Sequence, residues 1–155
     1  MSSNPQAGKI RVKAMCLIVH DGKVLVADGD TLQSSSPDRR VVPSSFYRVL
    51  GGSLEFQETV EQGVRREIRE ELNSEIENLE QLGVVENIFT YAGEPGHEIV
   101  FLYKGDLAKR ELYEKDRWHV VEDGYEFDAV WVPAEQVLNG SKPLYPVFDY
   151  ATILR

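Results

Sequence analysis

The most restrictive feature of this sequence is the segment 51–73, which joins a glycine pair to a helical pattern. After Gly51 and Gly52, apolar residues recur at every fourth position: Val60, Val64, Ile68 and Leu72. That period is typical of an α-helix with one buried stripe. A glycine pair lets the chain turn sharply where a strand ends. The segment therefore predicts a strand that ends at the glycines and a helix that packs on the core.

The rest of the chain alternates β-rich segments with loops. We expect residues 10–29 to form two strands joined at Asp21 and Gly22, because this dipeptide suits a hairpin turn. The polar stretch 30–45 has no periodicity and is expected to be a surface loop. Further expected elements are strands at 46–50, 79–91, 97–107 and 127–132, a turn at 92–96 and a short helix at 133–139. This order predicts an α+β fold or an α/β/α sandwich, with a mixed β-sheet between helices.

Length and composition are those of one domain. The chain has 155 residues, of which 42% are hydrophobic, and this is enough to fill one core. We expect a single domain over residues 1–155, with a flexible N-terminal segment at 1–8. The formal net charge is −9, from 17 Lys and Arg against 26 Asp and Glu. That excess argues against nucleic acid polymers and anionic membranes as partners, since both are bound by clustered cations.

The apolar runs of the chain are short. The run from Ala14 to Val19 is one of the longest, and it is far too short to span a bilayer. The polar start of the chain has no apolar signal-peptide core. We therefore expect a cytoplasmic protein.

Three glutamates lie close together on the predicted helix. Glu67, Glu70 and Glu71 fall within an arc of roughly 100° on one helical face, at the border of the apolar stripe. Like charges at these spacings destabilise a helix by a few tenths of a kcal/mol per pair, and partial burial adds to the cost. A divalent ion such as Mg²⁺ or Mn²⁺ would compensate, because hard cations prefer oxygen ligands.

An alternative interpretation leaves the glutamates without a ligand. Arg65, Arg66 and Arg69 could neutralise them as ordinary ion pairs on a solvated face. Gly63 favours the metal site, because a glycine inside a helix costs up to about 1 kcal/mol relative to alanine and a closely packed loop would explain it. The Gly52 carbonyl would then lie near the helix and could join the ligands.

The same residues resemble the Nudix box, the signature of the Nudix hydrolase family. The matching positions are Gly52, Glu58, Arg66, Glu67, Ile68, Glu70 and Glu71. Two positions depart from the pattern. Asn73 replaces a glycine, which is a mild change because asparagine also tolerates the left-handed conformation that ends many helices. Ser74 replaces an aliphatic residue and removes one apolar contact.

The resemblance implies the Nudix fold, an α/β/α sandwich, and a metal-dependent hydrolase of nucleoside diphosphates linked to another moiety. Carried over by position, the ligands of the catalytic Mg²⁺ or Mn²⁺ would be Glu67, Glu70, Glu71 and the Gly52 carbonyl. Glu58 and Arg66 would form an ion pair that orients the acidic cluster. Metal ions that neutralise phosphate oxygens and lower the pKa of a bound water supply most of what phosphoanhydride hydrolysis needs.

The sequence leaves the general base open. Glu67 is the candidate within the box. The candidates outside it are Glu122 and Glu126, which lie ahead of a predicted strand where a loop could reach the metal ions, and below them Glu98, which we expect to open a strand. For each of the three outside the box, a solvated surface carboxylate is the competing interpretation.

Substrate contacts are less constrained than the metal site. Arg48 could hold a substrate phosphate through two hydrogen bonds, or form a structural ion pair. Tyr47 and Tyr91 could stack on a base, although aromatic residues on strands often belong to the core. ADP-ribose, nucleotide sugars, dinucleoside polyphosphates and nucleoside triphosphates all stay open as substrates. The alternative function is a Nudix-fold nucleotide-binding or regulatory module without turnover, and family analogy allows a homodimer.

Overall fold

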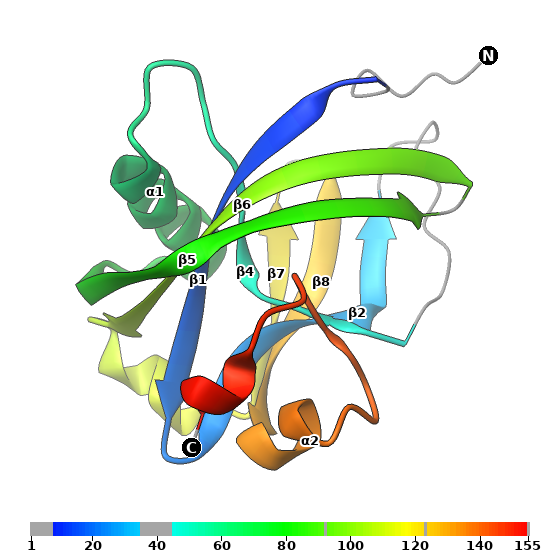
Figure 1. The fold of residues 1–155 in the computed structure, drawn as a ribbon. Coiled ribbons are helices and arrows are strands. Elements are labelled where there is room, and N and C mark those ends of the chain that lie inside the picture. Colours follow the sequence, from blue (N-terminus) through cyan, green and yellow to red (C-terminus); the bar gives the residue numbers. More distant parts are fainter. Residues whose placement is uncertain (1–7, 35–44, 92, 123, 155) are drawn as a thin grey trace.

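The computed structural model describes residues 8–34, 45–91, 93–122 and 124–154. Its elements, in chain order, are β1 (Ile10–His20), β2 (Lys23–Ser34), β3 (Tyr47–Arg48), β4 (Leu50–Ser53), α1 (Val60–Leu72), β5 (Ile76–Tyr91), β6 (Glu94–Leu107), η1 (Arg110–Glu114), β7 (Arg117–Glu122), β8 (Tyr125–Pro133), α2 (Ala134–Leu138), β9 (Leu144–Tyr145) and η2 (Tyr150–Thr152) (Figure 1). Within these ranges, no helix has the length and apolar character needed to cross a membrane.

Strand β1 connects two parts of the β-sheet. Its first part pairs in parallel with β6 and antiparallel with β4, and β6 pairs with β5 at one end of the strand order. The last residues of β1 pair with β2, which also pairs with β3 and β8. Strands β9 and β7 extend the sheet beyond β3 and β8. Parallel and antiparallel pairs both occur, so the prediction of a mixed sheet is confirmed.

Alternation along β1 divides the core between the two faces of the sheet. Even positions such as Ala14 and Ile18 belong to one buried cluster, together with the apolar stripe of α1. Odd positions such as Met15 and Leu17 belong to a second cluster, together with residues of α2 and η2. Successive residues of a strand point to opposite faces, so helices cover both sides of the sheet. This arrangement confirms the expected sandwich, and Figure 1 shows α1 and α2 on different sides of the strands.

Helix α1 is capped at both ends. Thr59 and Gln62 form a capping box, in which each side chain accepts a hydrogen bond from the other residue's backbone N–H at 2.9–3.1 Å. Asn73 ends the helix with φ 52° and ψ 42°, the left-handed conformation expected there. Ser74 is 4% exposed, and its hydroxyl donates one backbone hydrogen bond and accepts another. Both departures from the box pattern therefore fit the local structure.

Some element boundaries differ from our expectation. Strand β2 continues to Ser34, so residues 30–34, which we predicted to be loop, form part of this strand. The Thr31 hydroxyl accepts a hydrogen bond from the Asp128 backbone N–H of β8 at 2.8 Å, which holds this polar stretch against the sheet. The predicted turn at 92–96 is also shorter, because residues 94–96 pair with β5.

Strand β7 was missed entirely, since its few apolar residues show only a short alternation. Residues 35–44 of the predicted loop lie outside the described residues. The predicted flexible N-terminal segment also lies outside them, except for Gly8.

Candidate active site

The end of β4 and the loop after it lie directly against α1. A Cβ atom on Gly52 would be 2.5 Å from Glu67 Oε1 and 2.6 Å from its Cδ, so only glycine leaves room for this carboxylate. A Cβ atom on Gly63 would be 2.8 Å from Leu54 Cδ1 and 3.0 Å from Glu58 Oε1. The glycine inside the helix therefore allows the close packing of the loop that we expected from its position.

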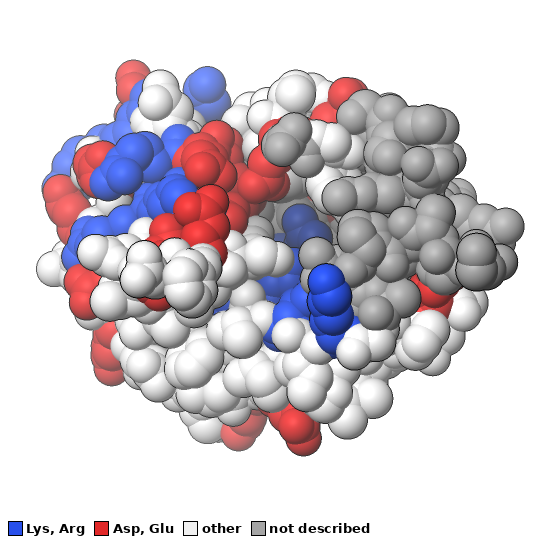
Figure 2. All heavy atoms as spheres, turned by 90° about the horizontal axis from the view of Figure 1, so that it is seen from above, with Lys and Arg blue, Asp and Glu red and all other residues white. Residues whose placement is uncertain are grey.

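Carboxylates from α1 and β7 converge beside the glycine pair. Oxygen atoms of Glu67, Glu70 and Glu122 lie within 4.8 Å of one another. Glu71 belongs to the same group, because its Oε1 accepts a hydrogen bond from Gly51 N at 3.1 Å and its carboxylate interacts electrostatically with Glu67 and Glu122. We call these four glutamates the acidic cluster. Figure 2 shows acidic side chains gathered at the edge of a hollow in this face of the molecule, with basic side chains within the hollow.

Burial and mutual repulsion raise pKa values in the acidic cluster. Burial raises the pKa of Glu71 well above its usual range, and the charge of Glu122 adds to the rise. Burial, followed by the charge of Glu67, raises the pKa of Glu122 to about 7. Glu67 and Glu71 are 4% and 6% exposed, and the Oε2 atom of each is buried without a hydrogen-bond partner in the described part of the chain. Such oxygen atoms are costly to bury, and a bound cation would satisfy them.

The donor set of the acidic cluster fits a hard divalent cation. All of its donors are carboxylate oxygens, the ligand type that Mg²⁺ and Mn²⁺ prefer. Two of the oxygens are buried and unpartnered, as expected for ligands whose ion is their partner. The backbone of Gly52 lies against Glu67. The Gly52 carbonyl is therefore still a candidate ligand.

Arg66 connects the acidic cluster to the loop before α1. Its Nε and Nη2 donate to the two oxygens of Glu58 at 2.7 and 3.0 Å, and Nη2 also donates to the Ser53 carbonyl at 2.9 Å. Its Nη1 donates to Glu67 Oε1 at 3.0 Å and lies 3.3 Å from Glu70 Oε2. The hydrogen bonds from Arg66 hold the pKa of Glu58 below its usual value. The structure thus contains the ion pair that the box pattern implies.

The alternative in which the helix arginines neutralise the glutamates holds for Arg66, which pairs with Glu67 and Glu70, but not for the other two arginines. Arg65 pairs with Glu61 at 3.0 Å, and Arg69 pairs with Glu75 at 2.7 Å. Both acids lie outside the acidic cluster. In the part of the chain that the structure describes, Arg66 is the one helix arginine that contacts the acidic cluster.

Two of the carboxylates considered as general bases have other partners. Glu126, in β8, lies 3.1 Å from His119 Nε2. Glu98 lies inside β6 rather than at its start, is 8% exposed and pairs with two cations of β1. The surface-carboxylate interpretation is therefore wrong for Glu98. Of the three candidates outside the box, only Glu122 joins the acidic cluster.

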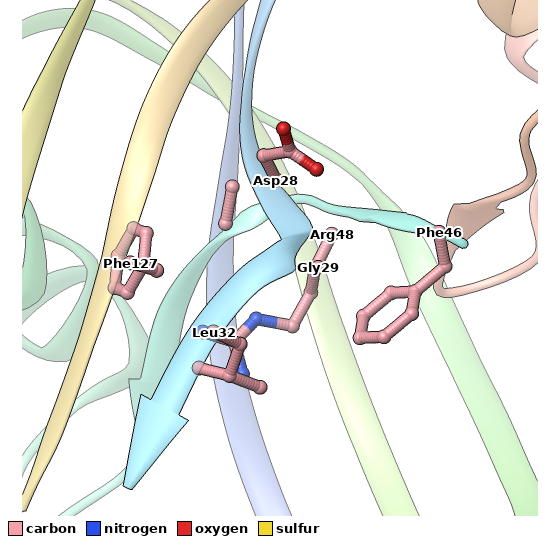
Figure 3. A pocket seen from close by; sticks show the side chains of 7 residues that line it. Asp28, Gly29, Leu32, Phe46, Arg48 and Phe127 are labelled. Atoms are coloured by element: carbon pink, nitrogen blue, oxygen red, sulfur yellow. The ribbon is translucent and has the colours of Figure 1, made fainter. Parts of the chain in front are cut away.

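Arg48 lines a small hollow above the buried ring of Phe127 (Figure 3). Its guanidinium carbon lies 5.8 Å from the ring centre. Its Nε is buried and has no hydrogen-bond partner among the described residues. Arg48 also forms no ion pair with any of these residues. Its charge opposes the rise in the pKa values of Glu71 and Glu122, so it acts on the acidic cluster. The structural ion pair that we considered for Arg48 is thus absent from this part of the chain.

The structure describes the side chain of Tyr47 but not that of Tyr91. The ring of Tyr47 lies under Lys142, with Nζ 4.2 Å from the ring centre, and it packs against the second core cluster. Tyr91 ends β5, and its side chain lies outside the described residues.

Sequence reasoning missed Arg11 and Lys13 of β1, of which Lys13 lies close enough to the acidic cluster to be affected by the charge of Glu67. They alternate with apolar residues, a pattern typical of the solvent side of a strand. The structure instead places both beside the buried Glu98. A charged pair at the start of an otherwise apolar strand was the one available signal.

Comparisons with known proteins agree with this geometry. A family model described as the NUDIX domain matches residues 9–151. The NAD-capped RNA hydrolase NudC of Pseudomonas aeruginosa is 49% identical over 61 residues, which are 39% of this chain and 21% of that protein. The chain thus spans about a fifth of the length of this curated relative.

Solved structures support the fold. The MutT NUDIX hydrolase from Burkholderia pseudomallei matches with a TM-score of 0.58 and 23% identity, over 94% of this chain and 95% of that chain. A NUDIX hydrolase from Nitrosomonas europaea matches with a TM-score of 0.57 and 19% identity, over 84% of this chain and 77% of that chain. At these identities the two matches establish the architecture alone.

Proposed function

Because this chain belongs to the NUDIX domain family, we propose that it is a pyrophosphohydrolase that uses Mg²⁺ or Mn²⁺ to cleave a phosphoanhydride bond in a nucleoside diphosphate linked to another moiety. The observation that carries the proposal is the convergence of Glu67, Glu70 and Glu122 beside two buried, unpartnered carboxylate oxygens. Carboxylates with a purely structural role are normally satisfied by hydrogen bonds or cations of the protein.

The ligands that we propose for the divalent ion are Glu67, Glu70, Glu71, Glu122 and the Gly52 carbonyl. When bound, the ion neutralises phosphate oxygens and lowers the pKa of water, which is the chemistry that phosphoanhydride hydrolysis needs. Arg66 holds Glu67 and Glu70 in place, and Glu58 holds Arg66 through two hydrogen bonds. This support keeps the oxygens of the cluster in one arrangement before substrate arrives.

Glu122 is the general base that the geometry favours. It lies in the acidic cluster and comes from a strand rather than from the helix, so one of its carboxylate oxygens can face a water bound there and accept its proton. Glu67 is the alternative within the box. Glu126 stays a weaker candidate, because His119 holds its carboxylate.

Arg48 is the residue that we propose to bind a substrate phosphate, because its guanidinium lacks a counter-ion in the described structure. A base-stacking role is less well supported for Tyr47, which Lys142 covers. Stacking by Tyr91 stays a prediction. A cytoplasmic location and a homodimer stay predictions as well.

The substrate class is the finer part of the proposal. ADP-ribose, nucleotide sugars, dinucleoside polyphosphates and nucleoside triphosphates all contain the phosphoanhydride bond that this chemistry requires. The name of the NudC relative adds NAD-capped RNA as a candidate, although the match covers 39% of this chain. The net charge of −9 argues against a sequence-independent grip on the RNA body, so we expect a small nucleotide as substrate.

A substrate panel with metal controls tests this function. Release of phosphate and nucleotide is measured for all these classes, with NAD and NAD-capped RNA included, in Mg²⁺, in Mn²⁺ and in chelator. We expect metal-dependent turnover of one class by the wild type and by Glu61→Gln, an exposed control on the same helix. We expect no turnover by Glu71→Gln, which should still fold. A panel without turnover, in which a nucleotide nevertheless raises the unfolding temperature, would instead support the nucleotide-binding module.

A further inference from the structure

Two cations of β1 share one buried carboxylate of β6. Arg11 Nη2 lies 3.0 Å from Glu98 Oε2, and Lys13 Nζ lies 3.9 Å from the same oxygen. Lys13 Nζ also donates a hydrogen bond to Ser53 Oγ at 3.0 Å. The side chains of Arg11, Lys13 and Glu98 are 29%, 16% and 11% exposed, so all three are largely buried. One carboxylate thus balances two partly buried cations.

Lys13 lies next to the acidic cluster. In the pairing of β1 with β4, Lys13 is opposite Ser53, which directly follows the glycine that contacts Glu67. The charges that act on the Lys13 ammonium are those of Glu98, Arg11, Arg48 and Glu67. Figure 2 shows basic side chains inside the hollow whose edge carries the acidic side chains. Lys13 therefore lies close enough to the acidic cluster for the charge of Glu67 to act on its ammonium group.

The cations around Lys13 outnumber the acids that contact them. Glu98 is shared by Arg11 and Lys13, and Arg48 has no ion pair among the described residues. Burial, helped by the charges of Arg11 and Arg48, lowers the pKa of Lys13 to about 8, against the opposing charges of Glu98 and Glu67. Like charges in a partly buried place repel one another more strongly than in water. An anion between them would relieve this repulsion and gain charge-assisted hydrogen bonds.

We propose that Lys13, with Arg11 and Glu98 beside it, binds a phosphate of the substrate adjacent to the phosphate held at the acidic cluster. The inference rests on the proposed function, because it takes the acidic cluster as the place of the scissile bond. A lysine ammonium is a compact charge with three donors, well suited to phosphate oxygens. Lys13 thereby contributes to binding the diphosphate that all the proposed substrate classes share.

A structural ion pair is the competing role for Lys13, and stability separates the two. Removing one partner of a buried ion pair destabilises a protein because the remaining charge is left uncompensated. Here, however, Glu98 would keep Arg11 at 3.0 Å. The substrate-binding role therefore predicts that Lys13→Met loses affinity without losing stability.

The test is a calorimetric titration with α,β-methylene-ADP, a diphosphate whose bridging carbon prevents hydrolysis, in buffer with Mg²⁺. We expect Lys13→Met to raise the Kd at least about tenfold, as for the loss of one hydrogen bond to a charged group. Lys13→Arg should retain most of the affinity. The matched control is Lys104→Met, whose side chain is 45% exposed and pairs with Glu80, and its Kd should equal that of the wild type. The unfolding temperature of Lys13→Met should be unchanged.

Equal Kd values for the wild type and Lys13→Met would overturn the inference, as would a wild type that does not bind the analogue. The titration needs no turnover, so failure of the proposed function appears separately, as a substrate panel without metal-dependent hydrolysis. Lys13→Gln provides a second variant if methionine at this position prevents folding.

Discussion

At the scale of single residues, Gly52 sets the position of Glu67, one of the proposed metal ligands. A methyl group at this position would lie 2.5–2.7 Å from the carboxylate atoms of Glu67 and would have to displace them. A displacement of about 1 Å in a catalytic group can cost about 100-fold in rate. We therefore predict that Gly52→Ala lowers kcat/KM by about 100-fold, measured with the substrate found in the panel.

The control for this substitution is Gly83→Ala in β5. There the added methyl group would meet the Phe148 ring at 3.2 Å instead of a carboxylate. We expect that variant to keep its kcat/KM, even if its unfolding temperature changes slightly. Wild-type activity in Gly52→Ala would show that the close approach to Glu67 is unimportant for the site.

Arg66 is the second residue with a role that geometry defines. Its guanidinium reaches Glu58, Glu67 and the Ser53 carbonyl at the same time, and lysine cannot donate along all of these directions. Groups that orient metal ligands typically change affinity or activity by about 10–100-fold when replaced. We predict a loss of this size in kcat for Arg66→Lys, measured at saturating Mg²⁺. Full recovery of kcat at high Mg²⁺ would limit the role of Arg66 to metal affinity.

At the scale of elements, the capping box of α1 should contribute to stability and little to chemistry. Thr59→Ala removes one of its two reciprocal hydrogen bonds, and loss of an N-cap side chain typically costs about 1 kcal/mol. We predict a lower unfolding temperature with nearly unchanged kcat at 25 °C. Exposed Thr90→Ala in β5 is the control for the loss of a threonine side chain. A large loss of kcat in Thr59→Ala would mean that the start of the helix positions the site directly.

Local patterns predicted the elements whose signals are local. The stripe of α1, its Asn73 end and the hairpin at Asp21 all follow from residues close in sequence. Strand β7 was missed because it has few apolar residues, and its place depends on pairing with β8. Glu122 was named as a base candidate, but its position beside α1 depends on that pairing.

Contacts between distant segments lay beyond the sequence argument. Glu98 was expected on the surface because its neighbours in sequence give no sign of a partner. The structure pairs β1 in parallel with β6, which brings Arg11 directly opposite Glu98. A single sequence contains the alternation of a strand but not the identity of the strand beside it. The proposed metal ligands were easier to predict, because one helix carries three of the four glutamates.

At the scale of the whole molecule, stability without metal should depend on pH through the acidic cluster. The raised pKa of Glu122, about 7, means that the folded protein binds this proton between about pH 4.5 and 7 while the unfolded chain releases it. Stability from this group is therefore present at low pH and lost as the pH rises through 7. We predict that, in chelator, the unfolding temperature falls more between pH 5.5 and 8 for the wild type than for Glu122→Gln.

Divalent metal should reverse this trend, because it binds the ionised carboxylates and stabilises the folded state by mass action. Added Mn²⁺ should therefore raise the unfolding temperature more at pH 8 than at pH 5.5. If the unfolding temperatures of the wild type and Glu122→Gln change identically with pH in chelator, the pKa of Glu122 is not raised.

The central claim is that the acidic cluster holds the divalent ion, and direct titration with Mn²⁺ tests it most simply. The account predicts that the wild type and the exposed helix control Glu61→Gln bind Mn²⁺ with equal affinity. Glu67→Gln, which removes a buried ligand, should bind at least about tenfold more weakly while retaining its fold. Equal Mn²⁺ affinity in the wild type and Glu67→Gln would contradict the account.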